Sequence, residues 1–365
     1  MQEPTLAGKS IPPHTERIVH PWVTIRRTRV LPRPGQIIRR RNDRVAADTV
    51  VGETDLPGGY RLVELDQELG PRGRDASKVL LKKVGQNVVQ GEAIARTGGI
   101  LNKEYASPVD GTIVDTRDSR VLIEIAPRHV ELVALYPGEI VSVMPRTGVV
   151  IETTGALIQG DWGTGPSFRA SLHCPVPTGD VPLLAGQISD EHVGGIVVGG
   201  RSLDAAALDQ AIEVGVRGLI VGSLSSDLLP RVRESGLALI VSEGWGNAPM
   251  PDRTFELLAE YVGQEVCFAP TSEGTAPAHR PELFGYAPGE EREERPSPYV
   301  PGEPLQVGTR VRVLRAPHLY AEGNIVSLPE VPQRLASGIV AWGAEVDLEG
   351  AGRDYVPLQN LESIR

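Results

Sequence analysis

The chain is poor in the residues on which disulfides, metal sites and membrane spans depend. Its 365 residues include two cysteines, Cys174 and Cys267, which are too few and too far apart for a disulfide framework or a cysteine metal site. This scarcity favours a reducing compartment. No apolar run approaches the roughly 20 residues that span a bilayer, and the first residues lack the pattern of a secretory signal. We therefore expect a cytoplasmic protein that does not enter a membrane.

The sequence also lacks the common catalytic patterns. None of its seven histidines forms an HxH, HxxxH or HExxH set, and no Walker, G-x-G-x-x-G or G-x-S-x-G motif is present. His173 adjoins Cys174, but a cysteine nucleophile needs an orienting partner, and the sequence identifies none. We expect no metal and no cofactor, we assign no catalytic residue, and we favour a protein that is not an enzyme.

Aromatic residues are scarce, whereas glycine and proline are abundant. Aromatics make up 4% of the chain, so Val, Leu, Ile and Ala must fill the cores. The 41 glycines and 31 prolines together make about a fifth of the chain, which is natural in a β protein with many turns. The length exceeds what one core serves, so we expect two or three domains.

Short strands are predicted from about residue 34 to 160. In this region a glycine repeatedly interrupts the chain, and β-branched residues that alternate with polar ones follow it. A helix is expected at 62–69, where Gly70-Pro71 would end it. The four clearest strand segments are 34–38, 84–88, 108–114 and 137–141.

A different pattern begins near residue 180. Apolar runs alternate with segments of helical spacing, and Ser202 stands where the first helix would be capped. Such alternation indicates a parallel sheet covered on both faces, here a small Rossmann-like α/β domain. The expected strands are 195–200, 218–222 and 237–241, and the expected helices are 202–213, 223–234 and 251–262.

The loops at the carboxyl ends of these three strands form the candidate ligand site. Open α/β sheets bind ligands at this edge, where glycines and helix amino termini favour anions and an arginine can hold a phosphate or carboxylate. The alternative is that these residues only make turns and caps, and that Trp245 anchors a docking loop. The candidate residues are Gly199, Gly200, Arg201, Ser202, Ser223, Ser242, Glu243 and Trp245.

Positive charge is concentrated near the amino terminus. The net charge is −10, yet nine arginines lie between Arg17 and Arg44. Such a segment can hold phosphates by counterion release, which makes Arg39, Arg40 and Arg41 candidate nucleic-acid contacts. The alternative, which the acidic balance of the whole chain favours, is a β face whose arginines meet acidic groups of the same protein.

Residues 84–95 and 107–114 resemble the two flanks of a barrel-sandwich hybrid, or hammerhead, domain. They read VGQNVVQGEAIA and SPVDGTIV. In that family, which includes biotinyl and lipoyl carriers, the hairpin between the flanks carries the modified lysine. Between the two flanks Lys103 is the only lysine, and its neighbours do not form the Met-Lys-Met or Asp-Lys-Ala sequence that surrounds the modified lysine in the carriers. The resemblance therefore implies a structural hammerhead without a biotinyl or lipoyl group.

The C-terminal segment resembles a KOW-type SH3-like barrel, the module of NusG-type transcription factors and some ribosomal proteins. The resemblance implies contact with RNA or protein, and Arg310, Arg312 and Arg315 are the candidate nucleic-acid contacts. The loop at 318–322, which often makes such contacts in that family, has no Lys or Arg. The matching residues are Gly308, Val311, Val313, Pro317, Gly323, Ile325 and Val326.

The expected fold class is a β-rich multidomain α+β protein. We divide it into an extended arm (1–20), a hammerhead β domain (21–165), a three-layer α/β domain (166–270), a linker rich in proline and charge (271–304) and a KOW/SH3-like barrel (305–365). This order, with residues 148–160 and 240–250, is similar to a family of uncharacterised bacterial proteins, and the similarity implies architecture alone.

Three functions are compatible with this organisation. We favour a non-enzymatic scaffold or adaptor with a protein partner, because no catalytic set accompanies the two β modules. One alternative is a sensor or enzyme that binds a phosphate- or carboxylate-bearing ligand at the strand-end loops. The other is RNA or ribonucleoprotein binding through the arginine segment and the C-terminal barrel.

Overall fold

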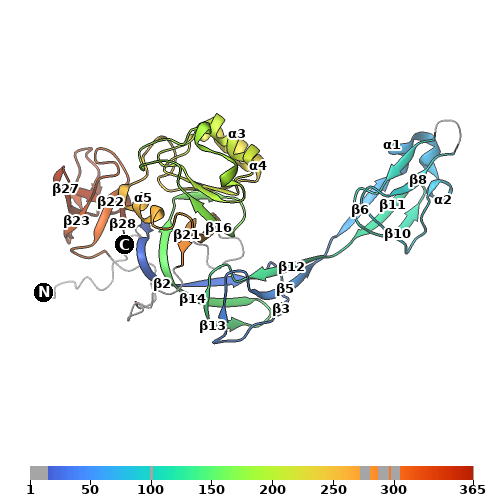
Figure 1. The fold of residues 1–365 in the computed structure, drawn as a ribbon, viewed down its shortest axis with the longest axis horizontal. Coiled ribbons are helices and arrows are strands. Elements are labelled where there is room, and N and C mark those ends of the chain that lie inside the picture. The colour runs from blue at the N-terminus through green and yellow to red at the C-terminus, as the bar shows by residue number, and fades with distance from the viewer. Residues whose placement is uncertain (1–14, 99–101, 272–279, 287–295, 297–304, 365) are drawn as a thin grey trace.

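Strands make up most of the regular structure and form several sheets, which confirms a β-rich chain with more than one structural unit. The computed structural model describes residues 15–98, 102–271, 280–286, 296 and 305–364. Most of the expected arm and much of the expected linker therefore lie outside the described residues. Figure 1 shows an elongated molecule in which one module stands apart at the end of a narrow ribbon.

The distal module, residues 60–125, has a hydrophobic core of its own, to which Leu65, Ile94 and Ile123 belong. Two sheets, ordered β6-β11-β10-β7 and β8-β9, enclose this core. The helix expected at 62–69 begins only at Leu65, because the preceding residues pair with β11 as a strand. The elements are β6 Tyr60–Glu64, α1 Leu65–Leu69, α2 Ala76–Val79, β7 Asn87–Val88, β8 Ala93–Arg96, β9 Glu104–Ala106, β10 Gly111–Arg117 and β11 Arg120–Ile125.

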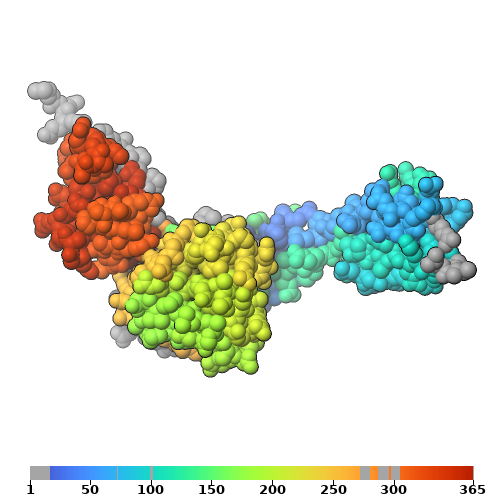
Figure 2. Space-filling model, turned by 90° about the horizontal axis from the view of Figure 1, so that it is seen from above, coloured from blue at the N-terminus to red at the C-terminus, as the bar shows by residue number. Residues whose placement is uncertain are grey.

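A two-stranded ribbon connects the distal module to the rest of the protein. The chain enters through β5 (Val50–Leu56) and returns through β12 (Arg128–Val133), which pair antiparallel. In the space-filling view the connection is a narrow neck (Figure 2). The distal module is thus held away from the other sheets.

On this ribbon His129 forms an ion pair that predicts a pH response. Its Nδ1 lies 2.9 Å from Oδ1 of Asp55 on the neighbouring strand. The hydrogen bond to Asp55 raises the pKa of His129 above its ordinary value. A raised histidine pKa means that the pair is present in mildly acidic solution and is lost as the pH rises through that pKa.

An NMR titration of the imidazole checks this expectation. Asp55→Asn should lower the pKa of His129, whereas Glu131→Gln, which removes only the weakest of the contributing charges, should change it less. Equal pKa values in the wild type and in Asp55→Asn would contradict the assigned cause.

The middle module lies at the base of the ribbon and has a second core, to which Val51, Ile140 and Ile151 contribute. The sequence assigned residues 21–165 to a single β domain, but within that range the structure has separate cores in the distal and middle modules. The long strands β2 and β14 pair along most of their length and continue into the central unit. The elements are β2 Val19–Val30, β3 Gln36–Ile37, β4 Arg44–Val45, β13 Gly138–Met144 and β14 Gly148–Gln159.

The central unit contains the three predicted parallel strands, β17, β18 and β19, and β16, which the sequence did not predict, pairs parallel with β17. Asp204, and not Ser202, caps the first helix, because its carboxylate accepts the backbone N–H of Ala207 at 2.8 Å. The elements are β15 Trp162–Thr164, β16 Phe168–His173, β17 Ile196–Val198, α3 Ala205–Val214, β18 Gly218–Val221, α4 Leu229–Ser235, β19 Ala238–Val241, α5 Asp252–Ala259 and β20 Glu265–Ala269.

Strand β21 (Glu282–Gly285) corrects the interpretation of residues 271–304 as a linker. It lies between β20 and β14 in the large sheet, and all four of its residues are buried. A strand of four residues with both faces covered has no alternation to reveal it, and the surrounding prolines and charges conceal it further.

The C-terminal sheet closes with a strand from the opposite end of the chain. Strand β1 (Thr15–Arg17), which the sequence assigned to an extended arm, pairs parallel with β28. The order is β1-β28-β22-β23-β26-β27, around a core that includes Val311, Val346 and Leu361. The remaining elements are β22 Arg310–Val313, β23 Glu322–Ser327, β24 Gln333–Arg334, β25 Val340–Ala341, β26 Gly343–Leu348, β27 Gly352–Pro357 and β28 Leu361–Ile364.

Candidate functional site

The strand-end loops are adjacent, as predicted, but their polar groups are engaged with one another. Arg201 donates from Nε to the carbonyl oxygen of Asp180 at 2.8 Å and from Nη1 to that of Asn247 at 2.9 Å. Ser202 donates to the side chain of the same Asn247 at 3.2 Å. The arginine fork therefore holds two loops together instead of facing an open site.

The small residues of these loops allow close packing. At Gly200 φ is +51°, and a Cβ atom would lie 2.2 Å from the carbonyl oxygen of Val181. A Cβ at Gly199 would lie 2.8 Å from the side chain of Val221. Ser223 is fully buried and donates to the carbonyl oxygen of Ala248 at 3.0 Å. These contacts agree with the alternative stated for the sequence, in which these residues make turns and packing contacts and do not bind a ligand.

Ser242 and Glu243 are buried beneath the C-terminal sheet, which corrects their assignment to an accessible ligand site. Glu243 accepts from Nη1 of Arg17 at 2.8 Å and also contacts Nη1 of Arg312. The carbonyl oxygen of Ser242 accepts from Arg17 as well, at 2.5 Å. Residues from the two ends of the chain thus cover the end of β19.

These groups belong to a buried ionic cluster between the central unit and the C-terminal sheet. Glu362 on β28 lies 2.9 Å from Nη2 of Arg312 and 3.1 Å from Nη2 of Arg280. Burial lowers the pKa of Arg17, but Glu243 and Glu362 outweigh it, so the Arg17 pKa lies above its ordinary value. The cluster therefore joins the two units through ion pairs.

Trp245 packs within the central unit. Its ring centroid lies 5.1 Å from that of Trp162 on β15, at an interplanar angle of 47°. Its side chain remains 44% exposed. This arrangement agrees with a loop anchor better than with a ring that receives a ligand.

A second buried cluster centres on Glu282 of β21. Arg27 donates to both of its carboxylate oxygens at 2.7 Å, and the hydroxyl of Tyr136 donates to one of them at 2.6 Å. Burial, followed by the Glu282 charge, raises the pKa of Tyr136 well above its ordinary value. All three groups are engaged with one another, which indicates a structural role.

The two clusters contain residues that the sequence did not single out, namely Tyr136, Arg280, Glu282 and Glu362. One signal was available: the sequence raised the alternative that the arginines between Arg17 and Arg44 meet acidic groups of the same protein, and Arg27 on β2 does so. The identity of their partners depends on pairings between distant segments.

The candidate nucleic-acid residues divide into two groups. Arg39, Arg40 and Arg41 are exposed. Of the C-terminal candidates, Arg310 is paired with Glu322 at 2.8 Å and with Glu349 at 2.9 Å, and Arg315 is exposed. The third, Arg312, is buried in the ionic cluster. Its assignment as a nucleic-acid contact is wrong, because its guanidinium already binds Glu243 and Glu362.

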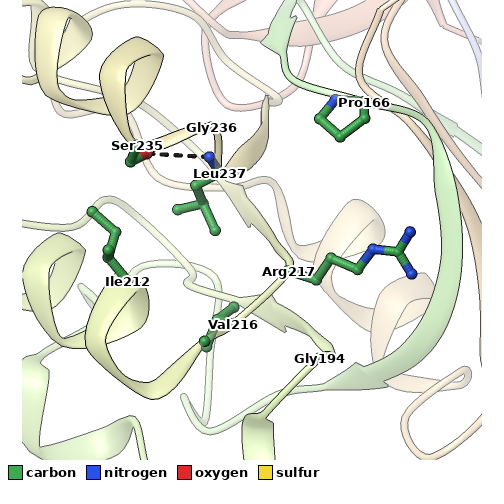
Figure 3. A pocket seen from close by; sticks show the side chains of 9 residues that line it. Pro166, Gly194, Ile212, Val216, Arg217, Ser235, Gly236 and Leu237 are labelled. Carbon is green, nitrogen blue, oxygen red and sulfur yellow. Dashed lines mark hydrogen bonds between the residues drawn. The ribbon is translucent and has the colours of Figure 1, made fainter. Parts of the chain in front are cut away.

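A pocket of about 310 Å³ lies at the opposite edge of the parallel sheet, where the loops after α3 and α4 meet (Figure 3). Its wall is mostly glycine and aliphatic. The guanidinium of Arg217 lies over the ring of Phe168, 4.1 Å from its centroid. The hydroxyl of Ser235 accepts the backbone N–H of Leu237 at 3.2 Å and donates to the carbonyl oxygen of Val232. The residues that line this pocket therefore include no set of reactive groups.

Among the residues that the structure describes, two further side chains with reactive groups are those of Cys267, which is buried, and Lys103, which is exposed. Burial raises the pKa of Cys267 to about 12, so its thiol is not a nucleophile near neutral pH. Across residues 15–364, wherever the structure describes them, no three His, Cys, Asp or Glu side chains are grouped as metal ligands. Lys103 is held by backbone hydrogen bonds with Thr97 at the base of the β8–β9 loop.

Comparison with known proteins adds no assignment. No protein-family model matches the chain, and no curated protein shows significant similarity to it. Within the described part of the chain, no helix has the length and apolar character to cross a membrane.

Proposed function

We propose that this protein is a non-enzymatic adaptor with a protein partner, as the sequence led us to expect. The observation that carries the proposal is the placement of the distal module, which has its own core and is joined to the rest by one ribbon (Figures 1 and 2). Such a layout separates one interaction surface from another. The groups at the strand-end loops, by contrast, are used in internal contacts.

The distal module offers a surface for such a partner. Leu81, Val84 and Val89, which belong to one segment of the module, are 48%, 54% and 61% exposed. Exposed apolar side chains mark a binding surface where they form a continuous patch, and these three lie within nine residues of the sequence. Within the proposal, this segment contacts the partner while the other units hold the ribbon in place.

Affinity capture with the whole chain tests the adaptor proposal. Replacing Leu81, Val84 and Val89 with Ser should reduce capture of a specific partner by about tenfold or more, since a total loss of about 1.4 kcal/mol from the three is enough and a single dominant contact residue costs more than that. The matched control replaces Leu184, Val193 and Val262 of the central unit, which are 52%, 60% and 46% exposed. A monomer that captures no macromolecule, or equal losses in both variants, would refute the proposal.

A further inference from the structure

The arginine segment divides into a paired half and an unpaired half. Arg17, Arg26 and Arg27 bind carboxylates of this chain, and Arg29 is buried and donates to the carbonyl oxygen of Val133. The arginines of this segment that follow Val30 are all exposed, and among them Arg39 donates from Nε to the carbonyl oxygen of Val50 at 3.2 Å. They and one arginine from the β13–β14 turn form no ion pair with any residue that the structure describes. This arginine surface comprises Arg33, Arg39, Arg40, Arg41, Arg44 and Arg146.

Hydrogen bonds fix the backbone on which these side chains stand. The N–H of Gly35 donates to the carbonyl oxygen of Arg146 at 2.8 Å, so the turns that carry Arg33 and Arg146 lie side by side. At the other end of β13, the N–H of Asn42 donates to Ile140 at 2.7 Å, which holds the turn with Arg40 and Arg41. Arg146 lies six positions after Ile140, which corresponds to at most roughly 20 Å of extended chain. The arginines therefore form two groups on a rigid support.

The chemistry of this surface matches phosphate groups. Residues 15–56 and 128–153 contain no lysine, so apart from His20 and His129 every basic side chain here is a guanidinium, whose planar fork pairs with phosphate oxygens. Two separated groups are suited to a chain of repeated phosphates rather than to one small anion. A protein partner would need an apolar centre at the interface. Beside the arginine turns Ile38 is 40% exposed, and one such side chain does not make an apolar centre.

The acidic balance of the whole chain does not prevent such contact. The net charge of −10 repels a polyanion only at long range, and charges are screened beyond about 8–10 Å at ordinary salt. Close to the surface the local charge depends on these arginines and on the nearby carboxylates, of which Glu139 stands opposite Arg44 in the β4–β13 pair. Asp43, the nearest carboxylate in the sequence, accepts the backbone N–H of Arg40 at 2.8 Å and forms no ion pair with a described arginine.

We propose that the arginine surface of the middle module binds the phosphate backbone of a nucleic acid. The contacts are made with phosphates, so binding is strongly salt-dependent and does not depend on base sequence. This proposal rests on the adaptor function, because it names a second partner of the adaptor. The nucleic acid binds the middle module, whereas the protein partner binds the distal module.

Fluorescence anisotropy with the full chain tests the proposal. The probes are a single-stranded RNA and a duplex DNA of mixed sequence, titrated between about 50 and 200 mM salt. The variant Arg33→Gln, Arg40→Gln, Arg41→Gln, Arg44→Gln should bind weakly. Its salt slope should fall by about 0.7 for each lost contact with the single strand and by about 0.9 with the duplex. The probe that the wild type binds more tightly at equal salt identifies the form of nucleic acid.

The matched control makes the same change in charge at four exposed arginines outside the surface, Arg61, Arg128, Arg233 and Arg253. Its affinity and salt slope should stay close to those of the wild type. Absence of binding at low salt, equal loss in both variants, or binding only to polyglutamate or anionic vesicles would overturn the nucleic-acid assignment. If that occurs while the Leu81 variant still loses its protein partner, the adaptor proposal stands by itself.

Discussion

Glu243→Gln is expected to loosen the C-terminal sheet from the central unit. The substitution keeps the shape of the side chain but removes one of the two carboxylates shared by Arg17 and Arg312, both of which are buried. Glu362 would then remain as the nearby counterion for both arginines. Removing one partner from a buried ion pair typically costs about 3–5 kcal/mol. Here two buried arginines would share a single carboxylate.

Hydrogen exchange of the β28 amides measures this loss locally, which suits a chain with several cores that need not unfold in one step. The control is Glu322→Gln, which removes the partner of Arg310 in a partly exposed pair. Such a pair contributes about 0–1 kcal/mol. Similar exchange in the two variants would mean that the buried cluster does not hold the units together.

Leu283→Ala should destabilise the central unit by about 2–5 kcal/mol, the usual cost of a cavity at a buried leucine. Leu283 is fully buried in β21, between β14 and β20. A residue in a true linker would change the free energy of unfolding very little, so a loss of this size would show that residues 282–285 belong to the core.

Urea unfolding followed by Trp fluorescence, to which Trp162 and Trp245 of the central unit contribute together with Trp22 and Trp342, checks this expectation. Leu184→Ala makes the same chemical change at a side chain that is 52% exposed. Its cost should lie within roughly 0.5 kcal/mol of zero, as for most surface changes. Equal midpoints for the two variants would show that β21 contributes little to the core.

The arginine segment shows how far sequence reasoning reached at the candidate site. Composition alone identified an unusual concentration of positive charge and two explanations for it, internal pairing or contact with phosphates. The structure assigns Arg17 and Arg27 to internal pairs and leaves Arg40 and Arg41 in solvent. Counting charges could not separate them, because pairing depends on which carboxylates the fold brings near.

The strand-end loops show the opposite case. The three parallel strands and their adjacent loops were predicted correctly, because short apolar runs between glycines are strong local signals. Their availability to a ligand was not predictable. It depends on Asn247, which accepts from Arg201, and on Arg17, which lies 226 residues from Glu243 in the chain.

The sequence by itself determined the local structure: where the chain turns, which runs are strands, and the absence of familiar catalytic motifs. These properties follow from glycine, proline and the alternation of neighbouring side chains. Only the tertiary structure decided that β1 completes the C-terminal sheet, that β21 is a core strand, and which arginines are neutralised. Those outcomes depend on partners far along the chain, since a charge can be buried only where the fold supplies its counterion.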